Sequence, residues 1–571
     1  MTKNLVTANA ENVNGGEFLL KSSTLNDTFI PEELNEEQNM VRQMCKDFII
    51  DAGDKGGQLD KQVELLDQAG SLGLLGAHIP EAYGGMGMDT HTNTLICEEL
   101  GGFGGGFTTS FAAHTGIGTL PILYFGTEEQ KQKYLPKLAS GELKAAYCLT
   151  EPSSGSDALA AKTRADLSED GQHYILNGQK MWISNAGFAD VFIVFAKIDG
   201  EHFTGFIVEK GTEGMSLGAE EKKMGIKGSS TRQVFFENAK VPVENLLGEY
   251  GKGHLIAFNI LNVGRFKLGA LSLGGMKSGV TTSVKYANER IQFGSPISSF
   301  GAIQHKLAEM AIKTVVLESQ VYRISHLLSK ARNENLDAGM SYAEALMKAA
   351  EEYAIECSIT KVVGSEFISY TVDEMVQIHG GNGFSEEYPA AGAYRDARIT
   401  RIYEGTNEIN RMLSVSMMLK KAMSGSIDLV TPAWAVQKEL ATPVDQVDFK
   451  GEMDEERYAL AQLKKLCLMV LGAVAKQQMD GKLNLKNEQE ILMNIADMFN
   501  EIFNVESLIL RIDKLNHLGQ KENIDMFTEI LKVYLTDAVS RSSKFATDAV
   551  VSFAEESLLV ALLGGIKRYT T

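Results

Sequence analysis

Features that would assign the chain to a special class of protein are scarce in its 571 residues. The five cysteines are odd in number and far apart, with no C-x-x-C pair, so a disulfide scaffold is excluded and a reducing cytoplasm is expected. Lys and Arg number 55 against 74 Asp and Glu, a net charge of −19, which lacks the basic footprint that nucleic-acid binding needs. The longest apolar run, residues 466–475, is too short for a membrane span of about 20 residues.

Sequence fingerprints of several common sites are also missing. Neither G-x-G-x-x-G nor G-x-x-x-x-G-K-[ST] occurs, which excludes the usual nicotinamide and nucleoside-triphosphate loops. The ten histidines are scattered and no His/Cys cluster has ligand spacing, so no metal site is expected. The one G-x-S-x-G, residues 214–218, lies between β-rich runs and is expected to be a β-turn rather than a nucleophile elbow.

Local signals change several times along the chain and divide it into domains. Turn dipeptides such as Asn177-Gly178 and Asp199-Gly200 separate β-rich runs in a central block, and helical periodicity lies on both sides. Near the C-terminus, apolar residues spaced 4-3-4-3 from Ile491 to Ile512 predict a bundle helix. The expected fold is mostly α with a central β-domain, in α-β-α order, plus a C-terminal α-helical bundle. The expected segments are an arm (1–32), a helical domain (33–145), the β-domain (146–252), a second helical domain (253–423), a linker (424–447) and an extra helical domain (448–571).

Two segments of the expected β-domain suit a flat, anionic ligand. Residues 147–157 end in small hydroxylated residues and a glycine, a turn in which N–H groups and hydroxyls can bind an anion. Trp182, one of only two tryptophans, lies in the β-run of residues 180–185, where its ring can shield a flat cofactor. Taken singly, each segment has an ordinary explanation: residues 147–157 could be a plain Pro/Ser/Gly loop, and Trp182 could be a half-buried core residue.

Two further segments lie in the second helical domain. Residues 290–294, with Gln304, fall at a helix end, where an arginine ordinarily complements the helix dipole. Glu404 stands between Tyr403 and Gly405 in an otherwise apolar setting, and a partly desolvated carboxylate of this kind can act as a base near neutrality. The ordinary alternative is a solvated loop glutamate.

Together these segments resemble the acyl-CoA dehydrogenase family of flavoproteins. The resemblance covers residues 36–419 and includes the stretch Leu-Leu-Gly-Ala-His-Ile-Pro-Glu-Ala-Tyr-Gly-Gly at 74–85. The sequence is most similar to the very-long-chain branch, because it has an extra helical block and carries Asn262 where shorter-chain relatives usually have an acid. The resemblance implies FAD-dependent α,β-dehydrogenation of long-chain acyl-CoA thioesters to trans-2-enoyl-CoA in fatty acid β-oxidation. It also implies a homodimer that passes electrons to an electron-transfer flavoprotein.

The resemblance further implies which residues form the site. In the family, FAD lies between the β-domain and the following helices of one subunit, and a second subunit reaches its adenine end. The implied FAD-binding residues are Tyr147, Leu149 and Thr150 beside the isoalloxazine, Gly155 and Ser156 at the pyrophosphate, Trp182 and Ser184 near the ring, Arg290, Phe293, Gln304, Gln377 and Gly381 at the adenosine diphosphate, and Thr406 and Glu408 completing the site. Glu408 departs from the amide of some relatives. The implied substrate-binding residues are Ser156, Asn262, Arg265 and Gly405.

The resemblance makes Glu404 the base that takes the α-proton while the β-hydride moves to the flavin. Some relatives have the catalytic base at the position that Gly264 occupies here. Glycine has no side chain that could act as a base, which leaves Glu404. A backbone N–H at Glu404 and a flavin hydroxyl would hold the thioester oxygen, and Arg265 would hold Glu404 or the substrate. Two alternatives remain open: an acyl-CoA oxidase, which passes electrons to oxygen, and a non-catalytic assembly protein on the same fold.

Overall fold

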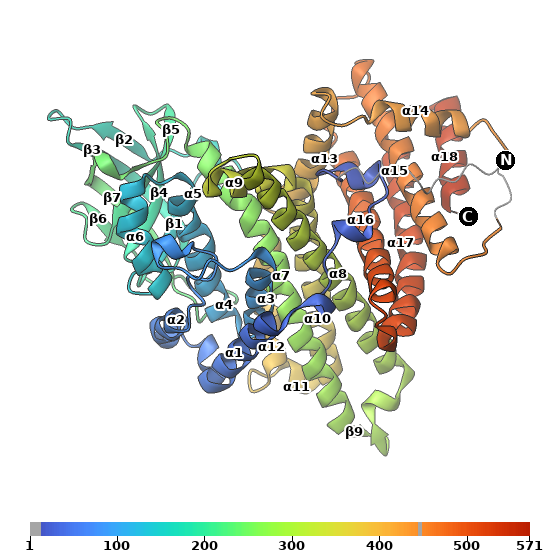
Figure 1. The fold of residues 1–571 in the computed structure, drawn as a ribbon, viewed down its shortest axis with the longest axis horizontal. Helices are drawn as coiled ribbons and strands as arrows, with labels where there is room; N and C mark the ends of the chain where they lie inside the picture. Colours follow the sequence, from blue (N-terminus) through green and yellow to red (C-terminus); the bar gives the residue numbers. More distant parts are fainter. Residues whose placement is uncertain (1–12, 444–447, 571) are drawn as a thin grey trace.

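A computed structural model describes residues 13–443 and 448–570. Figure 1 shows a β-sheet at one end, long helices in the middle and a separate group of helices at the other end. This arrangement confirms the predicted fold class of a helical protein with a central β-domain and an extra C-terminal helical domain.

The N-terminal domain is a compact set of short helices. Thr127 begins the last of them as a helix cap, because its hydroxyl accepts a hydrogen bond of 3.2 Å from the Gln130 N–H. The helices are α1 (Glu36–Ala52), α2 (Gln62–Ser71), α3 (Thr90–Gly101), α4 (Gly105–Ala112), a π-helical turn (Ala113–Gly118), α5 (Leu120–Phe125) and α6 (Glu128–Ser140).

The central domain is one mixed sheet in the order β6-β7-β3-β2-β4-β5-β8, with β1 pairing in parallel to β4. Its strands are β1 (Ala145–Cys148), β2 (Arg164–Leu167), β3 (His173–Ser184), β4 (Val191–Ile198), β5 (His202–Glu209), β6 (Met215–Leu217), β7 (Thr231–Pro242) and β8 (Leu246–Leu247).

One local prediction in this domain is wrong, and a second holds only in part. Asn177-Gly178 is not a hairpin turn but lies inside β3, at a register shift. Gly178 has φ 155°, and a Cβ there would lie 2.4 Å from Thr163 Oγ1, so the glycine serves close strand packing instead of a turn. In the 214–218 segment the expected turn is confined to Gly214, which has φ 86°, and residues 215–217 form the short strand β6, which pairs with β7.

The second helical domain holds the two longest helices, α7 and α8. Gly269 lets α7 approach α10, since a Cβ there would lie 2.2 Å from the Thr360 methyl group. Two further helices, α9 and α10, are separated at Tyr353. The elements are α7 (Gly253–Glu289), β9 (Ile291–Gln292), β10 (Ser295–Pro296), α8 (Gly301–Asp337), α9 (Tyr342–Glu352), α10 (Ala354–His379), α11 (Gly381–Phe384), α12 (Pro389–Ala397) and α13 (Asn407–Met423).

The extra domain consists of α14 (Val430–Glu439), α15 (Asp454–Met479), α16 (Gln489–His517), α17 (Ile524–Phe553) and α18 (Glu556–Thr570). The predicted 4-3 stripe lies on α16 and is buried throughout, which confirms it as a bundle core. The predicted linker 424–447 contains the helix α14, which packs on α15. Residues 444–447 of that prediction lie outside the described residues.

The N-terminal arm is draped between the core and the extra domain (Figure 1) and, over residues 13–32, is not loose. Phe18 is buried with its ring centroid 5.1 Å from that of Phe503 in α16. The Gly16 N–H donates to Glu356 Oε1 at 2.7 Å, and Arg511 pairs with Glu32 at 2.6 Å. Residues 1–12 of the predicted arm lie outside the described residues.

One helix in the described part of the chain, α15, is long and apolar enough to cross a membrane. Its most apolar window has a mean hydropathy of 1.4, and 50% of that window is buried inside the structure. The core helix of a helical bundle meets the same criteria, so the structure contains no clear membrane segment.

Candidate active site

A cavity of about 380 Å³ lies between α4, α7, α10, α12 and the loop before α13. Much of its wall is made of residues with little or no side chain, which leaves the interior open. Glu404 and Tyr403 border one part of it, beside Ser184 from β3. The glycines in its lining are Gly101, Gly102, Gly104, Gly105, Gly116, Gly264, Gly275, Gly279 and Gly392.

The loop that carries Glu404 has an unusual backbone. Glu404 has φ 58° and Gly405 has φ 83°, so two consecutive residues adopt the left-handed region, which glutamate disfavours. The Arg265 Nε–H donates to the Glu404 carbonyl at 3.2 Å, and Asn410 Nδ2 donates to the Gly405 carbonyl at 2.8 Å. Thr406 then begins α13 by accepting a hydrogen bond from the Ile409 N–H. These contacts hold the loop in a conformation that directs the carboxylate into the cavity.

The Glu404 carboxylate lies directly against α7. A Cβ built on Gly264 would lie 2.5 Å from Glu404 Oε2, so the missing side chain at Gly264 provides the space that the carboxylate occupies. Oε2 is buried and has no hydrogen-bond partner among the described residues. Burial raises the pKa of Glu404 to about 7, against the opposing effects of Arg265 and Lys361. A carboxylate that titrates near neutrality, with a free oxygen in a cavity, can accept a proton.

The β-domain contributes Ser184 of β3 to the cavity wall. The Met181 N–H donates to the Thr150 carbonyl at 3.0 Å, which joins the loop after β1 to β3. Lys180 forms a fully buried ion pair with Glu151 at 2.7 Å and also donates to the Leu149 carbonyl. These contacts fix the segments that contain the predicted residues Leu149, Thr150, Trp182 and Ser184.

Several predicted residues present unused groups at this side. Trp182 has φ 60° and remains 55% exposed, so its large ring is displayed rather than packed. The Tyr147 hydroxyl is buried without a partner among the residues the structure describes, and Tyr147 interacts electrostatically with Glu404. Gly155 and Ser156 are exposed on the loop after β1. A flat ligand with polar edges suits such a set.

The remaining predicted FAD residues lie elsewhere. Arg290 and Phe293 follow the C-terminal end of α7, Gln304 lies at the start of α8, and Gln377 and Gly381 lie around the end of α10. All five are exposed, with Phe293 95% exposed. Because α7 is one helix, this group lies ~38 Å from Gly264 at about 1.5 Å per residue. The structure therefore separates the predicted cofactor residues into two distant groups.

Other predicted residues flank Glu404. Asn262 is buried and accepts a 2.7 Å hydrogen bond from Arg265, so both sit beside Glu404 as one unit of α7. Glu408 is exposed in the first turn of α13. No cluster of three or more His, Cys, Asp or Glu that could hold a metal occurs among residues 13–443 and 448–570.

Sequence reasoning missed three polar residues that hold this site. Lys361 of α10 is fully buried and donates to Asn407 at 2.7 Å, and Asn410 binds the loop carbonyls as described. Lys361 carried a recognisable signal, since it is the one charged residue in the otherwise uncharged run 357–364. The two asparagines carried none, because polar residues are common at the start of a helix.

Comparisons with known proteins identify the family. Acyl-CoA dehydrogenase domain families match the chain as the N-terminal domain (31–142), the middle domain (146–239) and the C-terminal domain (251–419), and a further acyl-CoA dehydrogenase C-terminal domain matches residues 462–568. A probable acyl-CoA dehydrogenase of Bacillus subtilis is 45% identical over 563 residues, 97% of this chain and 94% of the relative. The human very long-chain specific acyl-CoA dehydrogenase is 42% identical over 399 residues, 67% of this chain and 58% of the relative.

A solved structure agrees with these matches over almost the whole fold. The crystal structure of an acyl-CoA dehydrogenase from Bacillus anthracis, complexed with FAD, superposes with a TM-score of 0.93 at 46% identity, and the match covers 98% of this chain and 96% of that one. The family expected from the sequence is therefore confirmed. The chain belongs to the acyl-CoA dehydrogenase family and is an acyl-CoA dehydrogenase with an additional C-terminal helical domain.

Proposed function

We propose that this enzyme uses FAD to dehydrogenate long-chain acyl-CoA thioesters between the α- and β-carbons, with Glu404 as the base. The observation that carries the proposal is the Glu404 carboxylate, whose unpartnered Oε2 lies in the space left by Gly264 at the edge of the cavity. A carboxylate with a pKa of about 7 accepts a proton at physiological pH.

The residues around the cavity fit FAD. Ser184 of the cavity wall and the unpartnered Tyr147 hydroxyl, which interacts with Glu404, offer polar contacts, and the half-exposed Trp182 on the same strand as Ser184 offers a flat surface. The exposed loop with Gly155 and Ser156 offers N–H and O–H donors for a pyrophosphate. Bound FAD supplies the hydride acceptor that the protein itself lacks. The chain's own task is to position the thioester, exclude water and take the α-proton at Glu404.

The shape of the cavity supports a preference for long acyl chains. Its lining follows α7 from Gly264 to Thr282, a distance of ~27 Å at about 1.5 Å per residue, which is far longer than a butyryl chain. Gly275 and Gly279 lie along that path and leave the wall without bulky side chains. A long, apolar chain buried there gains binding free energy with each methylene group.

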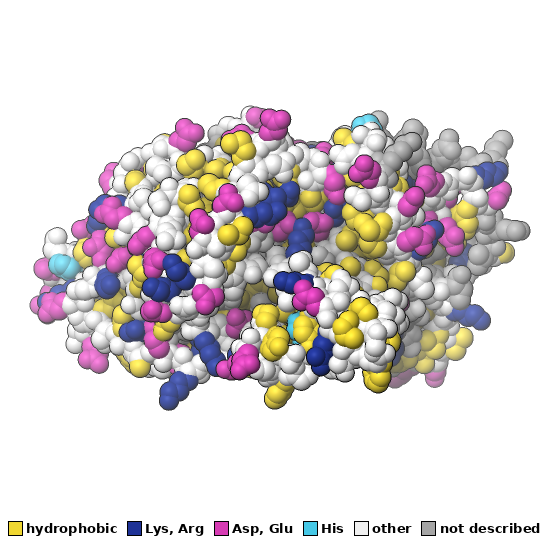
Figure 2. Space-filling model, turned by 90° about the horizontal axis from the view of Figure 1, so that it is seen from below, with side chains coloured by type: hydrophobic (Ala, Val, Ile, Leu, Met, Phe, Trp, Pro, Cys, Tyr) yellow, Lys and Arg dark blue, Asp and Glu magenta, His cyan; other side chains and the backbone are white. Residues whose placement is uncertain are grey.

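The separation of the two predicted cofactor groups supports a homodimer. Arg290, Phe293 and Gln377 lie too far from Glu404 to complete the same cofactor site within one chain, so we propose that they act on the FAD of a second copy. Figure 2 looks at the face that carries β9 and α11 and shows apolar side chains gathered there. Ile291 of β9 (51% exposed), Phe293 just after it and Phe384 of α11 (88% exposed) are exposed apolar residues of these elements, as expected for a surface that is covered in an assembly.

Family membership further supports a role in fatty acid β-oxidation with an electron-transfer flavoprotein as the electron acceptor. The five cysteines are all buried, and none of them forms a disulfide, which supports a reducing, cytoplasmic location. An acyl-CoA oxidase is the remaining alternative, and the rate at which oxygen reoxidises the reduced flavin distinguishes the two.

The proposal is tested with purified holoenzyme under anaerobic conditions. We expect about one FAD per chain and bleaching of the flavin by palmitoyl-CoA with a higher kcat/KM than by octanoyl- or butyryl-CoA. Glu404→Gln should retain FAD and bind acyl-CoA, yet bleach 10²- to 10⁴-fold more slowly, roughly the value of general-base catalysis. A protein that takes up no FAD, or a Glu404→Gln variant with activity within tenfold of the parent, would contradict the proposal.

A further inference from the structure

Lys361 is a fully buried lysine next to the loop that carries Glu404. It lies on α10, and its Nζ donates a 2.7 Å hydrogen bond to Asn407 Oδ1. Its partner is therefore a neutral amide rather than a carboxylate. A buried ammonium group with such a partner is costly for the fold, so the charged form of Lys361 depends on a negative group nearby, and Glu404 is such a group.

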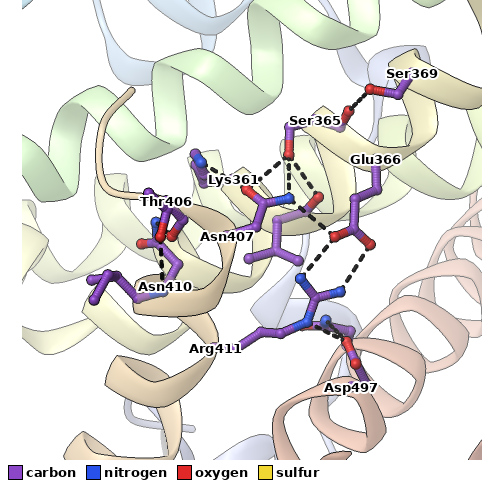
Figure 3. A network of polar contacts seen from close by, with 12 residues as sticks. Lys361, Ser365, Glu366, Ser369, Thr406, Asn407, Asn410, Arg411 and Asp497 are labelled. Atoms are coloured by element: carbon purple, nitrogen blue, oxygen red, sulfur yellow. Dashed lines mark hydrogen bonds and ion pairs between the residues drawn. The ribbon is translucent and has the colours of Figure 1, made fainter. Parts of the chain in front are cut away.

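A chain of polar contacts fixes the position of this ammonium group (Figure 3). Asn407 Nδ2 donates to Ser365 Oγ and Glu366 Oε1, both at 3.0 Å. Glu366 accepts two hydrogen bonds from Arg411, at 2.7 and 2.9 Å, and the Arg411 Nε–H donates to Asp497 of α16 at 2.8 Å. The first turns of α13 are thereby tied both to α10 and to the extra domain.

This anchorage also fixes the ammonium group relative to the catalytic loop. Asn407 comes three residues after Glu404, and the intervening residues are held by Asn410 and by the helix cap at Thr406. Lys361 and Glu404 therefore cannot move independently without breaking contacts on α10, α13 or α16.

The charges of the two groups favour each other. Burial lowers the pKa of Lys361 to about 7, and Glu404 opposes that effect. Burial raises the pKa of Glu404, which Arg265 and Lys361 oppose. Arg265 directs its Nε–H to the Glu404 carbonyl and another donor to Asn262, so its hydrogen bonds serve the backbone and a neighbour rather than the carboxylate.

The other ionisable groups around the pair leave Lys361 and Arg265 as the cations acting on Glu404. Tyr147 of β1 and Tyr403 face Glu404, but burial raises the pKa of both phenols, so they stay neutral at physiological pH. Glu366 and Glu408 face Lys361, and Glu366 is paired with Arg411.

We propose that Lys361 is a positioning residue for the catalytic carboxylate: its buried ammonium group, held by Asn407, supplies positive charge beside Glu404 and keeps that carboxylate in the ionised form that accepts a proton. This inference rests on the proposed role of Glu404 as the base. It predicts a specific change in pH dependence when the charge is removed, rather than a general loss of activity.

The test measures anaerobic flavin reduction by palmitoyl-CoA from pH 6 to pH 10 in the holoenzyme. Lys361→Met keeps the length of the side chain but removes its charge. The acidic limb of the kcat/KM profile should move upward by about one pH unit or more, with an approximately tenfold loss at pH 6.5 and recovery at pH 9. Lys361→Arg keeps the charge, so the acidic limb of its kcat/KM profile should lie at nearly the same pH as in the parent.

Two further variants keep the inference open to refutation. Asn407→Asp retains Lys361 but replaces its neutral amide partner with a carboxylate. The acidic limb of the kcat/KM profile should therefore again move to higher pH, which keeps the test usable even if Lys361→Met fails to fold. Lys464→Met removes another buried lysine, which pairs with Glu506 in the extra domain, and should leave the limb unchanged. An unmoved limb in Lys361→Met and Asn407→Asp, or an equal loss of rate at every pH, would overturn the inference.

The failure of this inference differs from the failure of the proposed function. If Glu404→Gln bleaches as fast as the parent, the base lies elsewhere and the proposed function falls first. If Glu404→Gln is slow while Lys361→Met and Asn407→Asp keep the parent's pH profile, only the role of Lys361 is refuted.

Discussion

The space at Gly264 gives a prediction in which activity and stability change in opposite directions. In Gly264→Ala the new methyl carbon would lie 2.5 Å from Glu404 Oε2 and 2.9 Å from the carboxyl carbon. Ordinary carbon–oxygen contacts are about 3.3 Å or longer, so the carboxylate must move by roughly 0.8 Å. The clash meets the far end of a flexible side chain, so the side chain rotates while the backbone of α7 stays in place.

A displacement of this size has a large effect on catalysis and little on folding. Misplacing a reacting group by about 1 Å can cost roughly 10²-fold in rate, because the carboxylate no longer meets the α-proton of the substrate. Replacing glycine by alanine inside a helix favours the folded state by up to about 1 kcal/mol. Flavin reduction by palmitoyl-CoA should therefore slow by up to about 10²-fold, while the Tm stays the same or rises.

Gly116→Ala is the matched control for this prediction. Gly116 also lines the cavity, but a Cβ there meets only the Lys267 side chain, at 3.8 Å, an ordinary contact. Stopped-flow reduction of the flavin and thermal unfolding are measured on both variants and the parent. If Gly264→Ala reduces its flavin within threefold of the parent, or if Gly116→Ala slows as much, the argument that Gly264 makes room for the base is refuted.

Three further predictions test stability and assembly. Burial raises the pKa of Glu356 from 4.5 to about 7, so between these pH values the folded state keeps a proton that the unfolded state releases, and stability falls as pH rises. Glu356→Gln cannot release that proton. Measured by urea denaturation, it should raise the free energy of unfolding by up to about 3 kcal/mol at pH 8 but little at pH 5. Lys180→Met leaves Glu151 buried without its cation and should destabilise the fold by about 3 kcal/mol in the same assay; a loss under 1 kcal/mol would contradict this. Phe293→Asp places a charge on the proposed subunit contact and should give monomers with weakened FAD binding by light scattering and absorbance, whereas an unchanged dimer would exclude this surface.

The parts of the fold that the sequence predicts well are those in which local pattern and tertiary packing agree. The 4-3 stripe on α16 is buried because that helix packs against its neighbours in the bundle, with every residue from 498 to 512 buried. Thr127 caps α6 through a hydrogen bond to a residue only three positions away. Asn177-Gly178 fails for the opposite reason. Its local signal is that of a turn, but the approach of Thr163, on the chain entering β2, requires a glycine inside a strand, and no local pattern encodes that neighbour.

The site shows the same division between local and distant information. The apolar neighbours of Glu404 made it a candidate base, but a solvated loop glutamate stayed open until the family resemblance was considered, because its surroundings come from α7, α10 and β1, all far from it in the sequence. For the arm, the sequence left a loose and a draped arrangement open, since its burial depends on Phe503 and Arg511, more than 450 residues away. Polar composition alone cannot distinguish a free segment from one that fills a groove between two domains.

The residues that break local rules nevertheless converge on one place. Gly264 stands inside a helix, where glycine is unfavourable; Lys361 is a fully buried lysine; and Glu404 adopts a backbone conformation that glutamate disfavours. Each looks like a separate defect in the sequence, yet in the fold Gly264 accommodates the carboxylate of Glu404, and Lys361 acts on its charge. Because natural sequences are otherwise locally consistent, a cluster of such violations around one carboxylate indicates selection for chemistry at that carboxylate rather than for stability.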